Sequence, residues 1–502
     1  MKDKARVDQG KEVALRALNF LRMMWLRSNP SPGQLHPTSM SKPVDQRRPP
    51  GALTILALLG AALFAVELWA VAAHQHRQFL MLLSAILISG VPFCLALWWT
   101  FWVRQFPRGS MALIIGGGIL FRLVLVPLDP APLSTDVYRY IWDGRVQAAG
   151  INPYLYLPVD RKLETLRDSS IYPNINRRDY AHTIYPPAAQ IFFFAVTRIT
   201  QSVIGFKGTI LLLEIGTMIL ILLTLQSIGQ PPQRLLAYAW HPLPIWEFGA
   251  SGHIDALMIF CIALALYARS RQRFAIVGCA LGLATLVKFV PALLFPALYR
   301  RWDKRMPISF AGTLLVLYLP YIVSAGPRVL GFLPQYLREE GLRNGARYYL
   351  LNLSDWILDW LGVVHGLPPA IFTAFALVVL GVAMLWAFLR NPSLNVSYPD
   401  RHLHWLHSGF VLALLFSVIL SSYYPWYYAW IVLFLCFVPN AAALALTLSL
   451  AQLYRSLVEQ SADDLFRSQS RVFLPFFSLL LVSWWLTWQR SRGSALFRQF
   501  HG

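Results

Sequence analysis

Long apolar runs, separated by short charged turns, follow one another along the chain from residue 53 to residue 488. Most of these runs approach the roughly 20 residues that an α-helix needs to cross the hydrocarbon core of a bilayer. The composition agrees, because the 502 residues are 56% hydrophobic and only 14% charged, with a mean hydropathy of +0.49. So few charges would not cover so much apolar surface in water. The pattern excludes a soluble protein and predicts an all-α, polytopic membrane protein of roughly 11–14 helices.

The expected spans follow from the limits of each apolar run. They are 53–73, 79–103, 111–128, 186–205, 209–225, 235–250, 256–268, 307–323, 367–389, 409–420, 426–438, 441–454 and 472–488. Strict alternation through all of them would place Arg269, Arg271 and Arg273 on the outer side, which the positive-inside rule disfavours. Between residues 186 and 235 we therefore expect either one segment that does not cross or two short ones that share a crossing.

The charge pattern gives an expected organisation. Lys and Arg number 44 against 24 Asp and Glu, a net charge of +20, and basic residues between spans orient a membrane protein. We expect a basic cytoplasmic tail and linker (1–51), a multi-spanning domain (52–489) and a basic cytoplasmic C-terminus (490–502). The polar stretches 129–185 and 324–366 then form two outer segments. The four cysteines lie in apolar runs without the spacing of a disulfide framework or a zinc site.

The run 274–299 carries basic residues on both flanks, so both of its ends should lie on the cytoplasmic side. It is far shorter than the roughly 40 residues of two full spans, which predicts a broken helical hairpin that enters the membrane and returns. The sequence KFVP at its centre places Lys288 at membrane depth. A lysine there is costly and suggests a site for an anion such as a lipid phosphate. The structural alternative is an ion pair with Glu214 or Glu247.

The outer segment 129–185 begins with a predicted short helix over residues 135–149, which Ser134 can cap. On such a helix Asp136, Arg139, Tyr140 and Asp143 share one face. Acids, bases and aromatic rings at a membrane surface suit a sugar site, in which a carboxylate removes the proton of a hydroxyl group. The alternative is an interfacial aromatic belt with an Arg139–Asp143 salt bridge.

Five sequence blocks carry a resemblance to a known family. In chain order they are STDVYRYIWDGRVQAAGINPYLYLP, TIYPPAAQ, SGHIDAL, LGLATLVKFVPALLFP and SYYPWYYAW, and they extend from Ser134 to Trp430. This combination resembles the GT-C membrane glycosyltransferases, in particular the polyprenyl-phosphate-mannose-dependent mannosyltransferases. The resemblance implies a GT-C-like core with a helical outer loop. It also implies inverting transfer of a sugar, with mannose expected, from a polyprenyl phosphate donor to an acceptor hydroxyl at the outer face.

The resemblance also implies roles for individual residues. The superfamily uses an acid of the first large outer loop as the base, and the matching position is Asp136, with Asp143 in reserve. The candidate ligands of the donor phosphate are Lys288, Arg338, Arg343 and Arg347, although the three arginines would also suit a solvated face. The candidate substrate contacts are Arg139, Tyr140, Arg145, Tyr185, His253, Asp255, Tyr424 and Trp426. Structural roles as helix caps or interfacial anchors stay open for His253 and the aromatic residues.

No cofactor is expected beyond the lipid-linked co-substrate, although an acid pair could recruit a divalent metal. The expected partners are a polyprenyl-phosphate sugar, a glycan or glycolipid acceptor and membrane lipids, with no nucleic acid. The expected location is a bacterial inner membrane, with the site on the outer side and a product in the cell envelope.

Two other functions stay open. A transporter or flippase of lipid-linked sugars would share the midplane cation but needs no outer helix with two carboxylates. A non-catalytic scaffold leaves the Asp136 face unexplained.

Overall fold

A computed structural model describes residues 51–102, 107, 109–340, 345, 347–362, 366–391, 403–456 and 462–499. This part of the chain contains nineteen α-helices and no β-strand, which confirms the all-α prediction. The α-helices are α2 (Ala52–Gln75), α3 (Phe79–Trp102), α4 (Ser110–Leu123), α5 (Asp136–Ala148), α6 (Pro187–Thr197), α7 (Val203–Ser227), α8 (Leu236–Ala239), α9 (Pro242–Pro244), α10 (Asp255–Ser270), α11 (Phe274–Thr285), α12 (Phe295–Leu298), α13 (Arg305–Ala325), α14 (Leu333–Glu339), α15 (Tyr349–Trp360), α16 (Pro369–Arg390), α17 (His404–Leu420), α18 (Ala429–Leu435), α19 (Ala441–Ser449) and α21 (Ala462–Gln499).

Shorter helical turns connect these helices. The 3-10 turns are η1 (Arg161–Leu166), η2 (Tyr172–Asn174), η3 (Pro232–Leu235), η5 (Val290–Leu294), η6 (Gly326–Leu330), η7 (Pro425–Tyr428) and η8 (Leu450–Arg455). The segment η4 (Ile245–Ala250) is a π-helix. The basic tail 1–50 and residues 500–502 lie outside the described residues.

Within the described residues, six helical segments are long and apolar enough to cross a membrane. They are Ala52–Gln75, Phe79–Phe101, Val203–Ser227, Arg305–Glu339, Pro369–Arg390 and Asp464–Leu486. Helices α13 and α16 expose many large apolar side chains, among them Leu315, Val316, Leu377 and Val378. Such surfaces are suited to contact with lipid tails. These features confirm the prediction of a multi-pass membrane protein.

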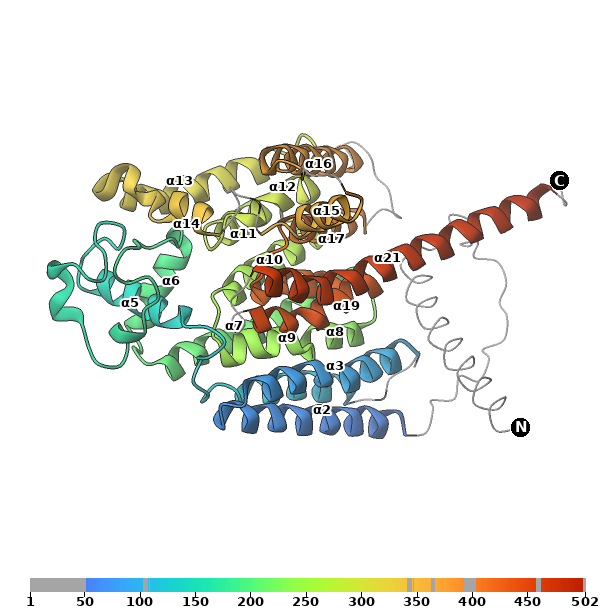
Figure 1. Ribbon diagram of the computed structural model, residues 1–502, viewed down its shortest axis with the longest axis horizontal. Helices are drawn as coiled ribbons and strands as arrows, with labels where there is room; N and C mark the ends of the chain where they lie inside the picture. The colour runs from blue at the N-terminus through green and yellow to red at the C-terminus, as the bar shows by residue number, and fades with distance from the viewer. Residues whose placement is uncertain are drawn as a thin grey trace.

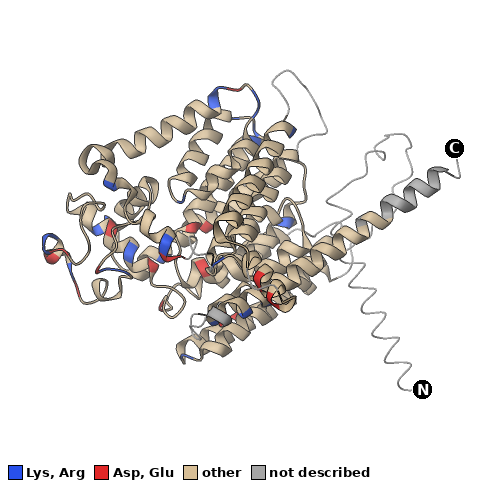
Figure 2. Ribbon diagram, turned by 45° about the horizontal axis from the view of Figure 1, so that its top comes forward, with Lys and Arg blue, Asp and Glu red and all other residues tan. Residues whose placement is uncertain are grey.

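The helices lie side by side along the long axis of the molecule (Figure 1). Helices α5 and α6 lie at one end, called the loop end below, whereas α2 begins and α21 finishes at the opposite end (Figure 1). Figure 2 shows charged residues gathered at the loop end and at the turns between helices. The long helices carry mostly other residues, as expected for segments that face lipid.

The uncertain stretch between residues 186 and 235 contains one helix that is too short to cross. Helix α6 has 11 residues, so it is about 17 Å long and does not span a core of about 30 Å. The predicted span 186–205 is therefore wrong, because it joined α6 to the first turn of α7. Helix α7 begins at Val203 rather than at residue 209. The side chains of Ser227 and Ser270 are joined by a 2.6 Å hydrogen bond, so α7 and α10 finish at the same end of the molecule.

Other predicted spans differ from the helices at their limits or their continuity. The segment 235–250 is broken into α8, α9 and η4, since Pro242 and Pro244 interrupt a regular helix. The segment 111–128 ends early, with the last residue of α4 at Leu123. The segment 441–454 changes from α19 to the 3-10 turn η8 at Leu450. The segment 472–488 is only the middle of α21, a helix of 38 residues.

The broken hairpin predicted for residues 274–299 is present. Helix α11 ends at Thr285, Lys288 lies in the break, and η5 and α12 lead back. The Nε of Arg269 donates to the carbonyl oxygen of Leu298 at 2.9 Å, which joins the residues before and near the end of the hairpin. The guanidinium groups of Arg269 and Arg300 lie 5.1 and 5.8 Å from the ring centroid of Phe274. Both ends of the hairpin therefore lie together, as the flanking charges predicted.

Candidate functional site

A cavity of about 720 Å³ lies at the loop end, between α5 and its following loop, α10, the break in the hairpin, α14 and η7. Eight residues that the sequence analysis singled out line this cavity: Asp136, Arg139, Tyr185, Asp255, Lys288, Arg347, Tyr424 and Trp426. The fold thus brings together residues as far apart in the chain as Asp136 and Trp426. The cavity also has apolar walls, which include Met258, Phe289 and Leu337.

Asp136 stands on the first turn of α5, where the predicted helix begins. The Ser134 hydroxyl accepts a hydrogen bond from the backbone N–H of Asp136 at 3.2 Å. The Asn176 amide donates to Asp136 Oδ1 at 2.6 Å, and the Nδ1 atom of His253 lies 3.7 Å from Oδ2. Burial raises the pKa of Asp136, although Lys288, Asn176 and Arg177 act in the opposite direction. A carboxylate with a raised pKa accepts protons more readily than an ordinary aspartate.

Lys288 projects into the cavity from the break between α11 and η5. Its Nζ donates to both carboxylate oxygens of Asp255, at 2.8 and 2.7 Å, and lies 4.2 Å from the ring centroid of Tyr427. The structural alternative of a pair with Glu214 or Glu247 is wrong. Glu214 instead pairs with Arg122 at 3.0 Å. Glu247 accepts a hydrogen bond from Tyr454.

Arg177 is a cavity residue that the sequence analysis missed. Its φ of 51° is left-handed, a conformation in which a non-glycine residue is uncommon and often marks a functional turn. The Nε atom of Arg177 donates to Glu339 at 3.1 Å, and the guanidinium lies 5.7 Å from the ring centroid of Tyr336. These contacts connect the first outer segment to α14. The neighbouring Asn176 was also missed, since an irregular loop carries no periodicity that marks its inward-facing residues.

The three predicted arginines of the second outer segment have different positions. Arg347 is buried at 2% exposure, lines the cavity and forms an ion pair with Glu340. Its Nη2 donates to the Ser422 hydroxyl at 2.6 Å, and its Nε is buried without a hydrogen-bond partner in the described part of the chain. Arg338 is exposed and does not line the cavity. Arg343 lies outside the described residues.

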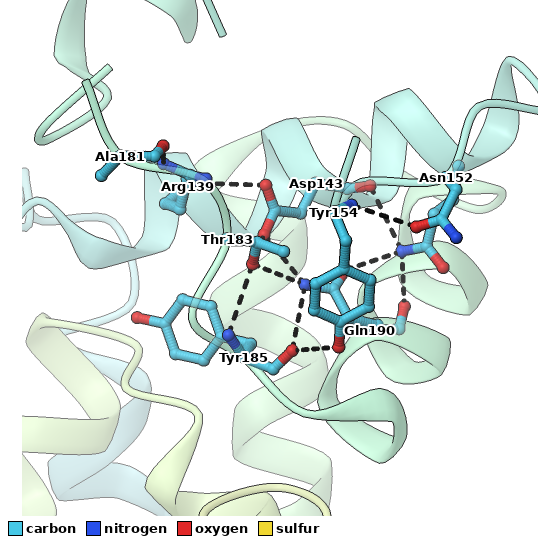
Figure 3. Close-up of polar contacts among 9 residues, drawn as sticks. Arg139, Asp143, Asn152, Tyr154, Ala181, Thr183, Tyr185 and Gln190 are labelled. Atoms are coloured by element: carbon cyan, nitrogen blue, oxygen red, sulfur yellow. Dashed lines mark hydrogen bonds and ion pairs between the residues drawn. The ribbon is translucent and has the colours of Figure 1, made fainter. Parts of the chain in front are cut away.

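Asp143 does not line the cavity. The Nε of Arg139 donates to its Oδ1 at 2.9 Å, and the Gln190 amide donates to its Oδ2 at 3.0 Å (Figure 3). The Thr183 hydroxyl donates to the same Oδ2. At 2% exposure this carboxylate joins α5 to α6 and to the end of the outer segment. The Arg139–Asp143 salt bridge that the sequence offered as a structural alternative is therefore present.

Two further residues that were predicted to contact the substrate, Tyr140 and Arg145, do not line the cavity. Tyr140 is 1% exposed and packs between Phe193 and Tyr185, with ring centroids 4.8 and 5.1 Å away. Arg145 points into the outer segment, where its Nη2 donates to Asp168 at 3.0 Å. Both residues hold the first outer segment together, which in turn positions Asp136.

Aromatic side chains of η7 form one wall of the cavity. Tyr424 and Trp426 stack with ring centroids 4.7 Å apart, and the hydroxyl groups of Tyr427 and Tyr336 are 2.7 Å apart. His253 lies behind this wall, fully buried and stacked on Trp426 at 3.9 Å. It does not line the cavity. A role as a direct substrate contact is therefore not supported by its position.

Within the ranges that the structure describes, no group of three or more His, Cys, Asp or Glu side chains is placed to hold a metal ion. The four cysteines have free thiol groups.

The fold and the cavity define a class: a polytopic helical membrane protein with a cavity whose lining combines apolar side chains, two carboxylates and several cations. A family model described as "Alpha-(1->6)-mannopyranosyltransferase, N-terminal domain", the MptA/B family, matches residues 50–303. The match covers half of the chain and includes α5, the first outer segment and the hairpin. The chain belongs to this family of mannosyltransferases, which are hexosyltransferases. The resemblance inferred from the sequence is thereby confirmed. Neither a curated protein nor a solved structure matches the chain.

Proposed function

We propose that the protein transfers mannose from a polyprenyl-phosphate-linked donor to an acceptor hydroxyl at the outer membrane face, with inversion and with Asp136 as the base. The observation that carries the proposal is the position of Asp136 in the cavity. Its described partners are the amide of Asn176 and the imidazole of His253, so no Lys or Arg forms an ion pair with it. Among the described residues that line the cavity, the one other acid is Asp255, and it is the partner of Lys288.

The reaction is a single displacement. The acceptor oxygen forms a bond to C1 of the mannose while the bond from C1 to the phosphate oxygen breaks. The acceptor proton goes to Asp136, and the electron pair of the broken bond leaves with the polyprenyl phosphate. The leaving group gains negative charge in this step, so fixed cations stabilise the transition state. Lys288, Arg177 and Arg347 lie around the cavity in positions to provide them.

The apolar part of the cavity suits a lipid carrier. Met258, Val287, Phe289 and Leu333 line its wall, and they come from α10, the hairpin and α14. A polyprenyl chain lying against these side chains would bury apolar surface, which favours binding. The aromatic wall of Tyr424 and Trp426 would then face the sugar.

The orientation is part of the same proposal. Arg269, Arg300 and Arg305 gather around Phe274 at the end opposite the loop end. The positive-inside rule makes that end cytoplasmic and the cavity extracytoplasmic. In a bacterial inner membrane both termini would then be cytoplasmic and the product would be an envelope glycan or glycolipid. An α-(1→6) linkage is the expectation from the family.

The experiment is sugar transfer by purified protein in lipid nanodiscs, with radiolabelled polyprenyl phosphate mannose as donor and membrane extract as acceptor. Wild type should transfer the label, and Asp136→Asn should lose transfer while it stays folded. Asp179→Asn is the matched control, because its side chain is 68% exposed and lies in the same outer segment without lining the cavity. Transfer that survives in Asp136→Asn would refute the assignment of the base. Binding of the donor by wild type without transfer would favour a transporter.

A further inference from the structure

A chain of buried polar groups leads from Asp136 away from the cavity and into the helix bundle. His253 Nδ1 lies 3.7 Å from Asp136 Oδ2, and on the other side of the ring His253 Nε2 lies 3.4 Å from Glu247 Oε2. The Tyr454 hydroxyl contacts both oxygens of Glu247, at 2.9 and 3.0 Å. The imidazole thus stands between two carboxylates, and one of them is the proposed base.

The local fold holds His253 in this position. The π-helix η4 ends with the N–H of Ser251 donating to the carbonyl oxygen of Trp246 at 3.2 Å, and π-turns are frequent at functional sites. Gly252 then takes a φ of +73°, and a Cβ at this position would meet Lys207 Cγ at 2.8 Å. This turn lets the N–H of His253 donate to the carbonyl oxygen of Glu247 at 3.1 Å. Glu247 therefore binds the backbone of the histidine through its carbonyl oxygen, and its carboxylate lies beside the imidazole ring.

The imidazole ring of His253 is buried without the hydrogen bonds that a buried polar group usually makes. It is 0% exposed and stacks on Trp426, whose other side lines the cavity. Within the described residues, neither of its ring nitrogens has a hydrogen-bond partner, and both are buried. Buried polar groups are nearly always paired, and exceptions call for an explanation. An apolar side chain would pack here at lower cost, so packing alone does not explain a histidine between two carboxylates.

We propose that His253, held by Glu247, is a positioning residue that acts through Asp136 and takes up the proton that Asp136 removes from the acceptor. This inference rests on the proposed function. The acceptor hydroxyl gives its proton to Asp136, and the same proton passes to Nδ1 of the neutral imidazole as the ring approaches. The carboxylate is then ionised again, and the imidazolium lies between Asp136 and Glu247. When the products leave, the proton returns through Asp136 to the polyprenyl phosphate or to water.

Other charged and titratable groups face this pair and shape its response to pH. Lys288 and Arg177 favour the ionised form of Asp136, whereas Asp255 disfavours it. Burial and then the nearby charge of Lys288 lower the pKa of His253, so the imidazole is neutral before it takes up the proton. Tyr140 and Tyr185 also lie within electrostatic reach of Asp136, and Tyr454 bonds to Glu247. Because Asp136 and His253 interact closely, their ionisations should be coupled.

The test compares His253→Gln, Glu247→Gln and Asp136→Asn in the nanodisc transfer assay, over a range of pH. We expect kcat to fall about 10²-fold in the first two variants, the lower end of the 10²- to 10⁴-fold that proton-transfer groups contribute, with the donor KM within about twofold of wild type. In wild type, kcat should fall at low pH with a limiting slope of two, because the active form has lost both protons of the pair. In His253→Gln the slope should be one.

His407→Gln is the matched control, since His407 also packs against a tryptophan, Trp386, with ring centroids 6.4 Å apart, and lies away from the cavity. It should keep the wild-type kcat and slope. A folded His253→Gln or Glu247→Gln with wild-type kcat and a slope of two would overturn the proposal, while an inactive Asp136→Asn would still uphold the base. An active Asp136→Asn would instead refute the proposed function. If His253→Gln does not fold, Glu247→Gln decides through kcat alone, and a wild-type kcat in that variant would overturn the proposal.

Discussion

Asp136 and Asp143 stand about two helical turns apart on α5, yet their surroundings differ throughout. Asp143 accepts hydrogen bonds from three side chains, Arg139, Thr183 and Gln190, and is 2% exposed. Asp136 accepts one, from Asn176, and its side chain is 21% exposed in the cavity. A carboxylate whose acceptor sites are filled holds a structure together, whereas one with free lone pairs beside a cavity remains available to a proton. The number of hydrogen bonds that each carboxylate accepts therefore distinguishes the two residues, although both are aspartates.

The largest expected effect is on catalysis and comes from substitution of Asp136, at the start of α5. Asp136→Asn keeps the size of the side chain and should lower kcat by about 10³-fold or more, since the amide does not act as a base. Asp136→Glu keeps the carboxylate but displaces it, and a misplacement of about 1 Å costs on the order of 10²-fold. Steady-state transfer kinetics measure both. Equal activity of the two variants would show that the position of the carboxylate is unimportant.

At Asp143, about two turns further along α5, the expected effect of a substitution is on stability. Asp143→Asn leaves the Arg139 guanidinium without its anion, and breaking a buried pair costs about 3–5 kcal/mol. The thermal-unfolding midpoint of the detergent-solubilised protein should fall, while the folded fraction keeps a substantial share of its activity per molecule. An Asp143→Asn variant that is as stable as wild type but inactive would make Asp143 the base instead.

The influence of Lys288 on Asp136 can be measured through the pH dependence of activity. Burial raises the pKa of Asp136 and Lys288 lowers it, so the acid limb of the activity profile lies above the ordinary aspartate pKa of about 3.9. Lys288→Met removes the cation, should raise the pKa of Asp136 further and so should move the acid limb to higher pH. It should also raise the donor KM several-fold, because a phosphate ligand is lost. A pH–rate profile at saturating donor measures the first effect, and an unmoved acid limb would place Lys288 outside the field of Asp136.

The smallest effect is expected within the outer segment. Partial burial would raise the pKa of Asp168, but hydrogen bonds from Arg145 and from the backbone N–H groups of Tyr172 and Ile171 hold it below its ordinary range. The resulting stabilisation is present above pH about 3.9 and is lost as the pH falls through the folded-state pKa. Arg145→Leu should therefore destabilise the protein by about 1 kcal/mol at neutral pH and by less at low pH. Thermal unfolding at pH 7 and at about pH 2, which lies below the ordinary aspartate pKa, tests this, and an equal loss at both would assign Arg145 a packing role instead.

The sequence predicts the parts of the site that depend on local patterns. The start of α5, the Asp136 position and the break at Lys288 all follow from spacing, caps and flanking charges over a few residues. The Arg139–Asp143 pair follows in the same way from its i, i+4 spacing. Such features are fixed by the short-range geometry of a helix and by the positions of charge around an apolar run.

The sequence does not predict contacts that depend on how distant segments pack. Asp255 as the partner of Lys288 requires the start of α10 and the hairpin to meet, and Arg177 reaches the cavity through an irregular loop. The position of His253 behind Trp426, rather than in the cavity, depends on a π-turn that no periodicity announces. The predicted span 186–205 ran across residues 198–202, RITQS, which in the structure separate α6 from α7.

The central claim is that Asp136 removes the acceptor proton during a single displacement at the donor. The most direct test is a single-turnover measurement of polyprenyl phosphate release, with labelled polyprenyl phosphate mannose prebound to wild type and to Asp136→Asn in nanodiscs and acceptor then added. We predict that both bind the donor with similar Kd, and that only wild type releases polyprenyl phosphate in step with mannose transfer. Release and transfer at the wild-type rate by Asp136→Asn would contradict the account.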